Sequence, residues 1–160
     1  MTVTQPSLTV VGLGYVGLPL VQEACRSGLL VVGLDTNAFV VTGLMSGESH
    51  IDDLDSTDIA RMLEFGFTAT DEPACIGESD VVVVCVPTPL DASGTPDLGA
   101  VKAATQAVSE NLCPGTLVVL ESTTFPGTTE DTVRPLLEEG SGLMAGVDFN
   151  LAYSPERIDP

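Results

Sequence analysis

A glycine-rich segment near the start of the chain has the residue types and spacing of a dinucleotide-binding turn. The apolar run 8–11 leads into the pattern G-x-G-x-x-G, with Gly12, Gly14 and Gly17. Gly12 suits a tight turn off the strand, Gly14 lets the backbone approach a pyrophosphate, and Gly17 allows the next helix to pack closely on the sheet. Backbone N–H groups and the positive end of that helix would face the phosphate charge.

A carboxylate follows the second apolar run at the distance that such a site requires. Asp35 directly follows residues 29–34. It has the spacing of an acid that accepts hydrogen bonds from an adenosine ribose. No arginine stands among Thr36, Asn37 and Ala38 to receive a 2′-phosphate, so the pattern favours NAD over NADP. A glycine turn between an ordinary strand and helix is the alternative, and it leaves the acid unexplained.

Three further loops place polar side chains where ligands collect in such folds, at the carboxyl ends of strands. They carry Thr88, the pair Ser122 and Thr123, and Glu156. The hydroxyls can bind ribose, a nicotinamide amide or water, but Ser and Thr also satisfy local backbone groups in most loops. Glu156 can act as a general base through water, or form a surface ion pair with Arg157. Both interpretations stay open for each residue.

The remaining reactive side chains give weaker signals. His50 is the sole histidine, and we interpret it as a solvated link residue rather than a catalytic one. The four cysteines lack C-x-x-C spacing, and we expect small buried residues in a reducing compartment. They are Cys25, Cys75, Cys85 and Cys113. No His, Cys or acidic cluster has metal-ligand spacing, so no metal is expected, and no Ser–His pairing suggests a hydrolase.

The elements that must position these residues alternate along the chain. Strands are expected at 8–11, 29–34, 67–70, 81–86, 117–120 and 147–153. Helical patterns separate them, which predicts an α/β fold: a Rossmann-type doubly wound parallel sheet with helices on both faces and strand order 3-2-1-4-5-6. The run 81–86 lacks polar residues, as is typical of a strand covered on both faces.

Local signals predict where several of the helices begin. Ser56, Asp97 and Thr128 are plausible caps. Pro135 lies inside a helical pattern, so we expect a kink or a short first segment there. Residues 90–96 are expected to form an irregular loop.

The length and net charge of the chain limit the kinds of function that it can have. The 160 residues suit one domain, and a net charge of −18 with only five Lys and Arg argues against nucleic acid. We attribute the acid excess to solubility rather than to an acidic interaction surface. No basic leader or apolar segment of about 18 residues is present, so we expect neither a signal peptide nor a membrane span. We therefore expect the chain to be cytoplasmic.

Four motifs, taken together, resemble the N-terminal NAD-binding domain of the UDP-glucose/GDP-mannose dehydrogenase family. They are Val-Gly-Leu-Gly-Tyr-Val-Gly-Leu at 11–18, Val-Pro-Thr-Pro-Leu-Asp at 86–91 with Gly94 and Pro-Asp-Leu at 96–98, Glu-Ser-Thr-Thr-Phe-Pro-Gly-Thr-Thr at 121–129, and Tyr-Ser-Pro-Glu-Arg at 153–157. The resemblance covers nearly the whole chain. The Ser-Pro-Glu-Arg form is similar to the branch that acts on UDP-N-acetylglucosamine or UDP-N-acetylmannosamine, whereas the UDP-glucose branch more typically has Asn-Pro-Glu-Phe.

The resemblance implies an NAD-dependent, two-step oxidation of a sugar C6 alcohol to a carboxylate, with a UDP-sugar as substrate and a homodimer for the full-length protein. In the family, a cysteine thiolate captures the aldehyde, a second hydride passes to NAD to give a thioester, and water cleaves that thioester. By position, Thr123 would help to place that water and Glu156 would serve in thioester hydrolysis. The residues that would hold NAD are Gly12, Gly14, Tyr15, Val16, Gly17, Asp35, Thr88 and Ser122.

Parts of the family pattern have no counterpart in this chain. The nucleophilic cysteine of a Gly-Gly-x-Cys segment, its lysine and asparagine partners, the central helix and the C-terminal UDP-sugar domain are absent from residues 1–160. A basic residue commonly follows the ribose acid, but Phe39, Val40 and Val41 stand there. We therefore expect a cofactor-binding half that binds NAD and turns over no sugar alone. The alternatives are a UDP-glucose 6-dehydrogenase fragment, a hydroxy-acid or 6-phosphogluconate-like dehydrogenase, and a non-catalytic NAD-binding module.

Overall fold

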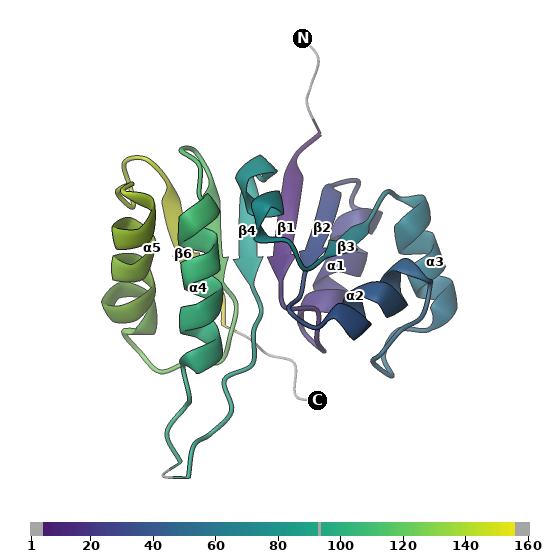
Figure 1. Cartoon of the computed structure of the whole chain (residues 1–160), viewed down its shortest axis with the longest axis horizontal. Coiled ribbons are helices and arrows are strands. Elements are labelled where there is room, and N and C mark those ends of the chain that lie inside the picture. Colours follow the sequence, from purple (N-terminus) through teal and green to yellow (C-terminus); the bar gives the residue numbers. More distant parts are fainter. Residues whose placement is uncertain (1–4, 93, 156–160) are drawn as a thin grey trace.

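The computed structural model describes residues 5–92 and 94–155, and it contains one six-stranded sheet (Figure 1). All strand pairs are parallel, in the order β3-β2-β1-β4-β5-β6, which confirms the predicted topology. The strands are β1 (Ser7–Val11), β2 (Leu30–Leu34), β3 (Thr68–Thr70), β4 (Val81–Val84), β5 (Leu117–Leu120) and β6 (Asn150–Tyr153).

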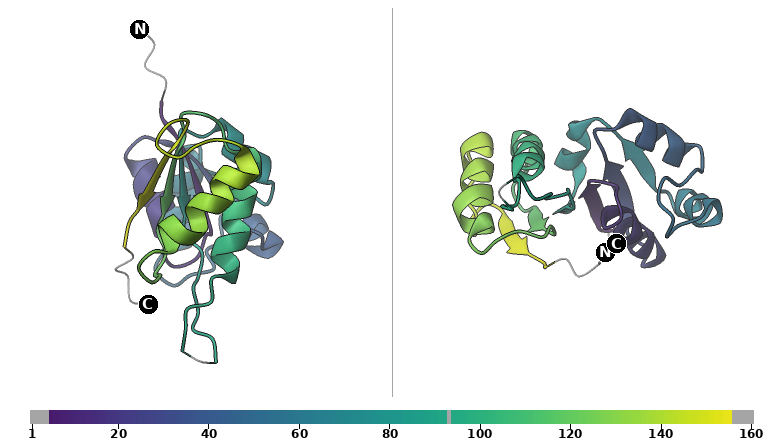
Figure 2. Two further views of the ribbon diagram at one scale, coloured as in Figure 1. Left: turned by 90° about the vertical axis from the view of Figure 1, so that its left-hand side faces the viewer. Right: turned by 90° about the horizontal axis from the view of Figure 1, so that it is seen from below.

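Helices cover both faces of the sheet, as Figure 2 shows from below. The helices α1 to α3 pack with the β1–β3 half, and α4 and α5 lie together over the β4–β6 half. They are α1 (Gly17–Arg26), α2 (Ala38–Met45), α3 (Ser56–Glu64), α4 (Gly99–Asn111) and α5 (Arg134–Ser141), with a 3-10 helix η1 (Pro73–Glu78) and a π-helix η2 (Thr128–Val133). No helix in the described part of the chain is both long and apolar enough to span a membrane.

The hydrophobic core has two layers, one on each side of the sheet. Side chains of successive strand residues alternate between them. In and just after β4, Val82 and Val84 belong to the layer under α4 and α5, whereas Val83 and Cys85 belong to the layer under α1. All four are buried, which confirms that this apolar run is an interior strand covered by helices on both faces.

The N-terminal cap of α3 lies one residue before the predicted Ser56. The Asp55 carboxylate accepts a hydrogen bond from the Asp58 backbone N–H at 3.0 Å, and the Asp58 side chain accepts one from the Asp55 N–H at 3.1 Å. This reciprocal capping box outcompetes a single serine cap because it satisfies two helix donors. The hydrogen bond from Asp58 also lowers the pKa of the Asp55 carboxyl group.

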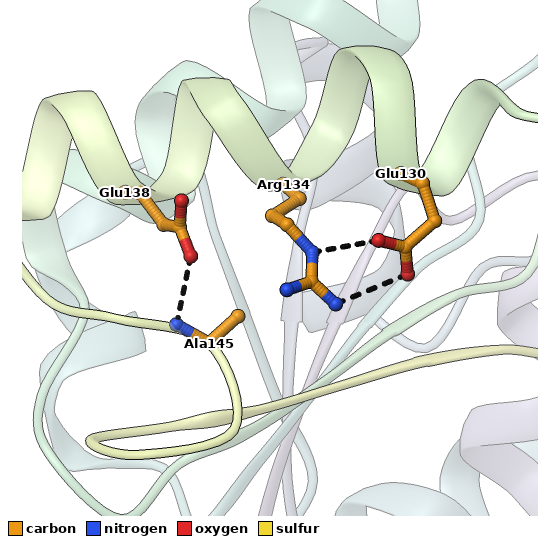
Figure 3. Close-up of polar contacts among 4 residues, drawn as sticks. All are labelled: Glu130, Arg134, Glu138 and Ala145. Atoms are coloured by element: carbon orange, nitrogen blue, oxygen red, sulfur yellow. Dashed lines mark hydrogen bonds and ion pairs between the residues drawn. The ribbon is translucent and has the colours of Figure 1, made fainter.

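The segment around Pro135 begins as a π-helix, which confirms the expected short first segment. Thr128 is not its cap, because Gly127 precedes the helix at φ +94° and the Thr128 hydroxyl instead donates to the Phe125 carbonyl at 2.9 Å. The proline falls in the first turn of α5, where its missing N–H costs little. Arg134 ties the two helices together by a two-pronged contact with Glu130, with N–O distances of 2.8 and 3.1 Å (Figure 3).

The last strand starts at Asn150, three residues later than predicted. The residues before it are held in a turn instead: the Glu138 carboxylate accepts from the Ala145 N–H at 3.0 Å (Figure 3), and Asp148 accepts from the Met144 N–H at 2.9 Å. Within the expected strand, the N–H groups of residues 147, 148 and 149 donate to the Met144 carbonyl at 3.2, 2.8 and 3.5 Å, so the turn uses donors that a strand would pair with its neighbour. Phe149 is buried at the end of this turn and directs the chain into the sheet.

The loop between β4 and α4 is more regular than predicted and extends beyond the sheet (Figure 1). Leu90 and Pro96 form an antiparallel bridge, and the Asp97 N–H donates to the Pro89 carbonyl at 2.7 Å. Asp97 accepts from the Gly99 N–H at 2.8 Å, but the residue at the cap position of α4 is Leu98, so the predicted cap is displaced by one residue.

Two adjacent leucines on α5 allow a test of the packing. Leu137 is fully buried, whereas Leu136 is half-buried. We expect Leu137→Ala to lower the free energy of unfolding by about 2–5 kcal/mol, because it removes a buried side chain and leaves a cavity. Urea denaturation measures the change, with Leu136→Ala as the matched control. Equal losses for the two variants would contradict this arrangement of the core.

Candidate functional site

A cleft of about 750 Å³ opens at the carboxyl edge of the sheet. It lies where the strand order reverses, because α1 leaves β1 toward one face and α4 leaves β4 toward the other. Open parallel sheets bind ligands at such a point. The lining comes from the glycine turn, the segments that follow β2, β3, β4 and β5, and one side of α4.

The three glycines of the turn have distinct surroundings. Gly12 has φ +93°, and a Cβ there would lie 2.6 Å from the Cys85 carbonyl oxygen. A Cβ on Gly17 would lie 1.8 Å from the Gly12 carbonyl oxygen, so only glycine lets α1 begin this close to the turn. A Cβ on Gly14 would meet no atom within 4 Å, which leaves the space beside this backbone open.

That open space is bordered by backbone donors. Within residues 5–92 and 94–155, the N–H groups of Gly14, Tyr15 and Val16 have no acceptor. They precede the first turn of α1, so the positive end of the helix dipole reinforces them. A cradle of free N–H groups without a side chain in front fits an anionic pyrophosphate, and it needs no cationic side chain.

Asp35 is fixed in place beside this turn. One carboxylate oxygen accepts from the Leu13 N–H at 2.9 Å and the other from the Asn37 N–H at 2.9 Å. Each carboxylate oxygen has a further lone pair, so both can still accept from the hydroxyls of a ribose. The Asn37 side chain is itself engaged, because it accepts from the Phe39 N–H at 3.0 Å as the cap of α2.

Thr88 and Ser122 line the cleft, but each hydroxyl group already donates its hydrogen to a backbone carbonyl. Thr88 donates to the Thr123 carbonyl, which joins the loops after β4 and β5. Ser122 is 3% exposed and donates to the Val86 carbonyl at 2.9 Å. Both hydroxyls therefore satisfy backbone groups, which is one of the two interpretations that the sequence allowed. A contact with a ligand would use the remaining lone pairs of the hydroxyl oxygens.

Thr123 differs from its neighbour, because its side chain is exposed at the cleft and makes no hydrogen bond within the described residues. Glu156 lies outside those residues. The chain enters that segment through Ser154, whose hydroxyl donates to the Glu121 carboxylate at 3.4 Å. Of the two predicted catalytic residues, the structure thus locates Thr123 in the cleft beside Ser122.

Several lining residues were not identified from the sequence. One side of α4 presents four alanines to the cleft, with the i, i+3, i+4, i+7 spacing of a helix face, and their small side chains leave room for a ligand. They are Ala100, Ala103, Ala104 and Ala107. Asp71, Pro73 and His50 complete the lining around the β2–β3 half. His50 is exposed, as expected for the link segment, but it also lies at the cleft.

The cysteines divide into three environments. Cys25 and Cys85 are buried, as predicted, and burial raises the pKa of the Cys25 thiol to about 11. Cys75 is half-buried, which is less than the prediction of a buried residue, and desolvation raises the pKa of its thiol as well. Cys113 is exposed, so the prediction of a buried residue is wrong there, because it lies two residues past the end of α4 in the exposed segment 113–115. Within the described ranges, no three His, Cys, Asp or Glu side chains are grouped to hold a metal ion.

Comparison with known proteins gives a consistent result. The sequence profile of the UDP-glucose/GDP-mannose dehydrogenase family, NAD binding domain, matches residues 6–160. A UDP-N-acetyl-D-glucosamine 6-dehydrogenase of Pseudomonas aeruginosa is 40% identical over 155 residues, which cover 96% of this chain and 36% of that protein. A UDP-N-acetyl-D-mannosamine dehydrogenase of Pyrococcus horikoshii is also 40% identical over 155 residues, covering 96% and 37%.

The fold agrees with these relatives. A solved structure of the UDP-D-ManNAc dehydrogenase from Pyrococcus horikoshii superposes with a TM-score of 0.89 at 39% identity, covering 96% of this chain and 37% of that one. The chain thus spans about a third of the length of the curated relatives that it matches.

The glycine turn provides a matched pair of variants. We expect Gly17→Ala to destabilise the fold, because its Cβ would lie on a backbone oxygen that cannot move aside. Gly14→Ala should leave the thermal midpoint within a few degrees of the wild type but weaken NAD binding at least about tenfold, since the methyl group enters the open cradle. Thermal denaturation and calorimetric titration measure the two effects. Equal stability loss in both variants would show that the cradle has been assigned wrongly.

Proposed function

Because the chain belongs to the UDP-glucose/GDP-mannose dehydrogenase family, as its NAD-binding domain, we propose that it is the cofactor-binding part of a UDP-N-acetylhexosamine 6-dehydrogenase. The whole enzyme would oxidise the C6 alcohol of the sugar to the uronate in two NAD-dependent steps. The observation that carries the proposal is one cleft, bordered by free backbone N–H groups at one side and by Asp35 and Thr123 at others.

The cofactor would lie along the carboxyl edge of the sheet. The N–H groups of Gly14, Tyr15 and Val16 would offset the pyrophosphate charge, while Gly12 and Gly17 hold the turn in shape. The two oxygens of Asp35 would accept from the ribose hydroxyls through their unused lone pairs.

The opposite half of the cleft would receive the nicotinamide end. Thr88 and Ser122 fix the loops after β4 and β5 and can offer hydroxyl lone pairs to a ribose or an amide. Bound NAD would accept a hydride from the sugar carbon in each step. The sugar would have to bind beside the nicotinamide. Thr123 would then lie at the reaction centre, because its exposed side chain lines this part of the cleft.

Two residues of this chain would take part in the hydrolytic half of the reaction. The Thr123 hydroxyl, free within the described residues, would help to place the water that cleaves a thioester. Glu156 would accept a proton as that water attacks. The thiolate that forms the thioester would come from a segment outside these 160 residues, because none of their four cysteines matches the family's Gly-Gly-x-Cys motif.

The form of the segment after β6 and the named relatives support a UDP-N-acetyl sugar over UDP-glucose. The sequence there reads Ser154-Pro155-Glu156-Arg157, and the relatives compared above are a UDP-N-acetylglucosamine 6-dehydrogenase and a UDP-N-acetylmannosamine dehydrogenase.

Calorimetric titration tests cofactor binding. We expect saturable heat with NAD, and at least about tenfold weaker binding of NADP. A 2′-phosphate would approach the Asp35 carboxylate in a part of the cleft that no Lys or Arg of residues 5–92 or 94–155 lines. Asp35→Asn provides the control, since it removes the repelling charge and should narrow the difference between the two cofactors. An absence of heat with NAD would contradict the proposal.

A second measurement separates binding from turnover. The 160-residue chain, mixed with NAD and either UDP-N-acetylglucosamine or UDP-N-acetylmannosamine, should produce no sustained NADH absorbance. Neither the UDP-sugar domain of the family nor its thiolate nucleophile is among these residues. Titrated NADH calibrates the detection limit in the same cuvette. Continuous NADH formation by this chain would show that another group carries the chemistry.

A further inference from the structure

His50 shares the cleft lining with the residues around Asp35. The lining residues of this half follow β2 and β3 or belong to α2, and His50 lies on the segment that leaves α2. The hydroxyl residues Thr88, Ser122 and Thr123 belong to the other half, after β4 and β5. His50 is therefore on the side of the cleft where Asp35 would hold the adenosine ribose.

The charge of the lining makes this histidine unusual. The charged side chains that line the cleft are Asp35, Asp71 and Glu121, all acidic. No Lys or Arg of the described ranges is among the lining residues, so His50 is the one lining side chain there that can carry a positive charge. An imidazole can donate a hydrogen bond from either ring nitrogen in its charged form.

The loop holds His50 in a defined position. On one side, the Ser49 hydroxyl donates to the Ile51 carbonyl at 2.9 Å and accepts from its N–H at 3.3 Å, which encloses His50 in a small turn. On the other, the Glu48 N–H donates to the Gly43 carbonyl at 2.9 Å and fixes the loop to the end of α2. Ile51 and Leu54 are each 4% exposed and anchor the segment in the core, while His50 itself stays exposed.

We propose that the His50 imidazole is a hydrogen-bond donor to the adenosine half of NAD. The inference rests on the proposed cofactor function and adds a residue to it. It assigns to His50 a role in affinity at the end of the cleft far from the reacting carbon, as a binding residue and not as a catalytic one.

Affinity for a fragment of the cofactor tests the proposal. We expect His50→Ala to weaken both NAD and ADP-ribose by the same factor, about three- to tenfold, because ADP-ribose contains the complete adenosine half. His50→Gln keeps an N–H donor and should lose less. Gln106→Ala, an exposed change on α4 outside the cleft lining, is the control and should bind as the wild type does.

The sole histidine also gives a direct spectroscopic signal. In the untagged chain, the imidazole resonances belong to His50 alone, and ADP-ribose should shift them at concentrations that match the calorimetric affinity. Unshifted resonances, or an unchanged ADP-ribose affinity in His50→Ala, would overturn the proposal while wild-type NAD binding leaves the proposed function intact. Loss of NAD binding by the wild type itself would instead overturn the proposed function.

Discussion

The closeness of α1 to the turn that precedes it is the constraint on which the site depends. Because Gly17 has no Cβ, the helix starts against the Gly12 carbonyl, and the N–H groups of residues 14–16, which have no acceptor in the described part of the chain, border the cleft. Two hydrogen bonds then hold this turn to the end of β2: the Gly12 N–H donates to the Leu34 carbonyl at 2.8 Å, and the Leu13 N–H to Asp35 at 2.9 Å. These hydrogen bonds join the glycine turn and Asp35 into one structural unit.

The fold was predictable from the sequence because its signals are local and repeated. Apolar runs and helical spacing alternate along the chain, and right-handed crossovers leave few ways to arrange six parallel strands. Errors occur at element ends, where one side chain decides the outcome. Asp55 displaced Ser56 because a carboxylate three residues later completed the box. A turn around the Met144 carbonyl, supported by Glu138 and Asp148, keeps residues 147–149 out of β6, and such contacts depend on neighbours that periodicity does not reveal.

The site was only partly predictable, for a related reason. The glycines and Asp35 follow from backbone geometry, which a spacing pattern encodes. The hydrogen-bond partner of each hydroxyl cannot be read from such a pattern. Thr88 and Ser122 donate to carbonyls 35 and 36 residues away in the chain, and only the folded structure brings those groups together. The alanine side of α4 and the position of His50 at the cleft also arise from tertiary packing. Inside the sheet, Thr9 is fully buried and paired with Ser79 at 2.6 Å, a polar contact without a sequence signature.

The two hydrogen bonds to Asp35 have an energetic consequence. A carboxylate that is free in solution samples several rotamers and must be immobilised when a ligand arrives, which reduces affinity. Here the backbone has already immobilised it, so the entropy of that side chain is lost during folding and not during association. Preorganisation of this kind would lower the entropic cost of binding a dinucleotide to a short, neutral turn and a single acid, in a domain with a net charge of −18.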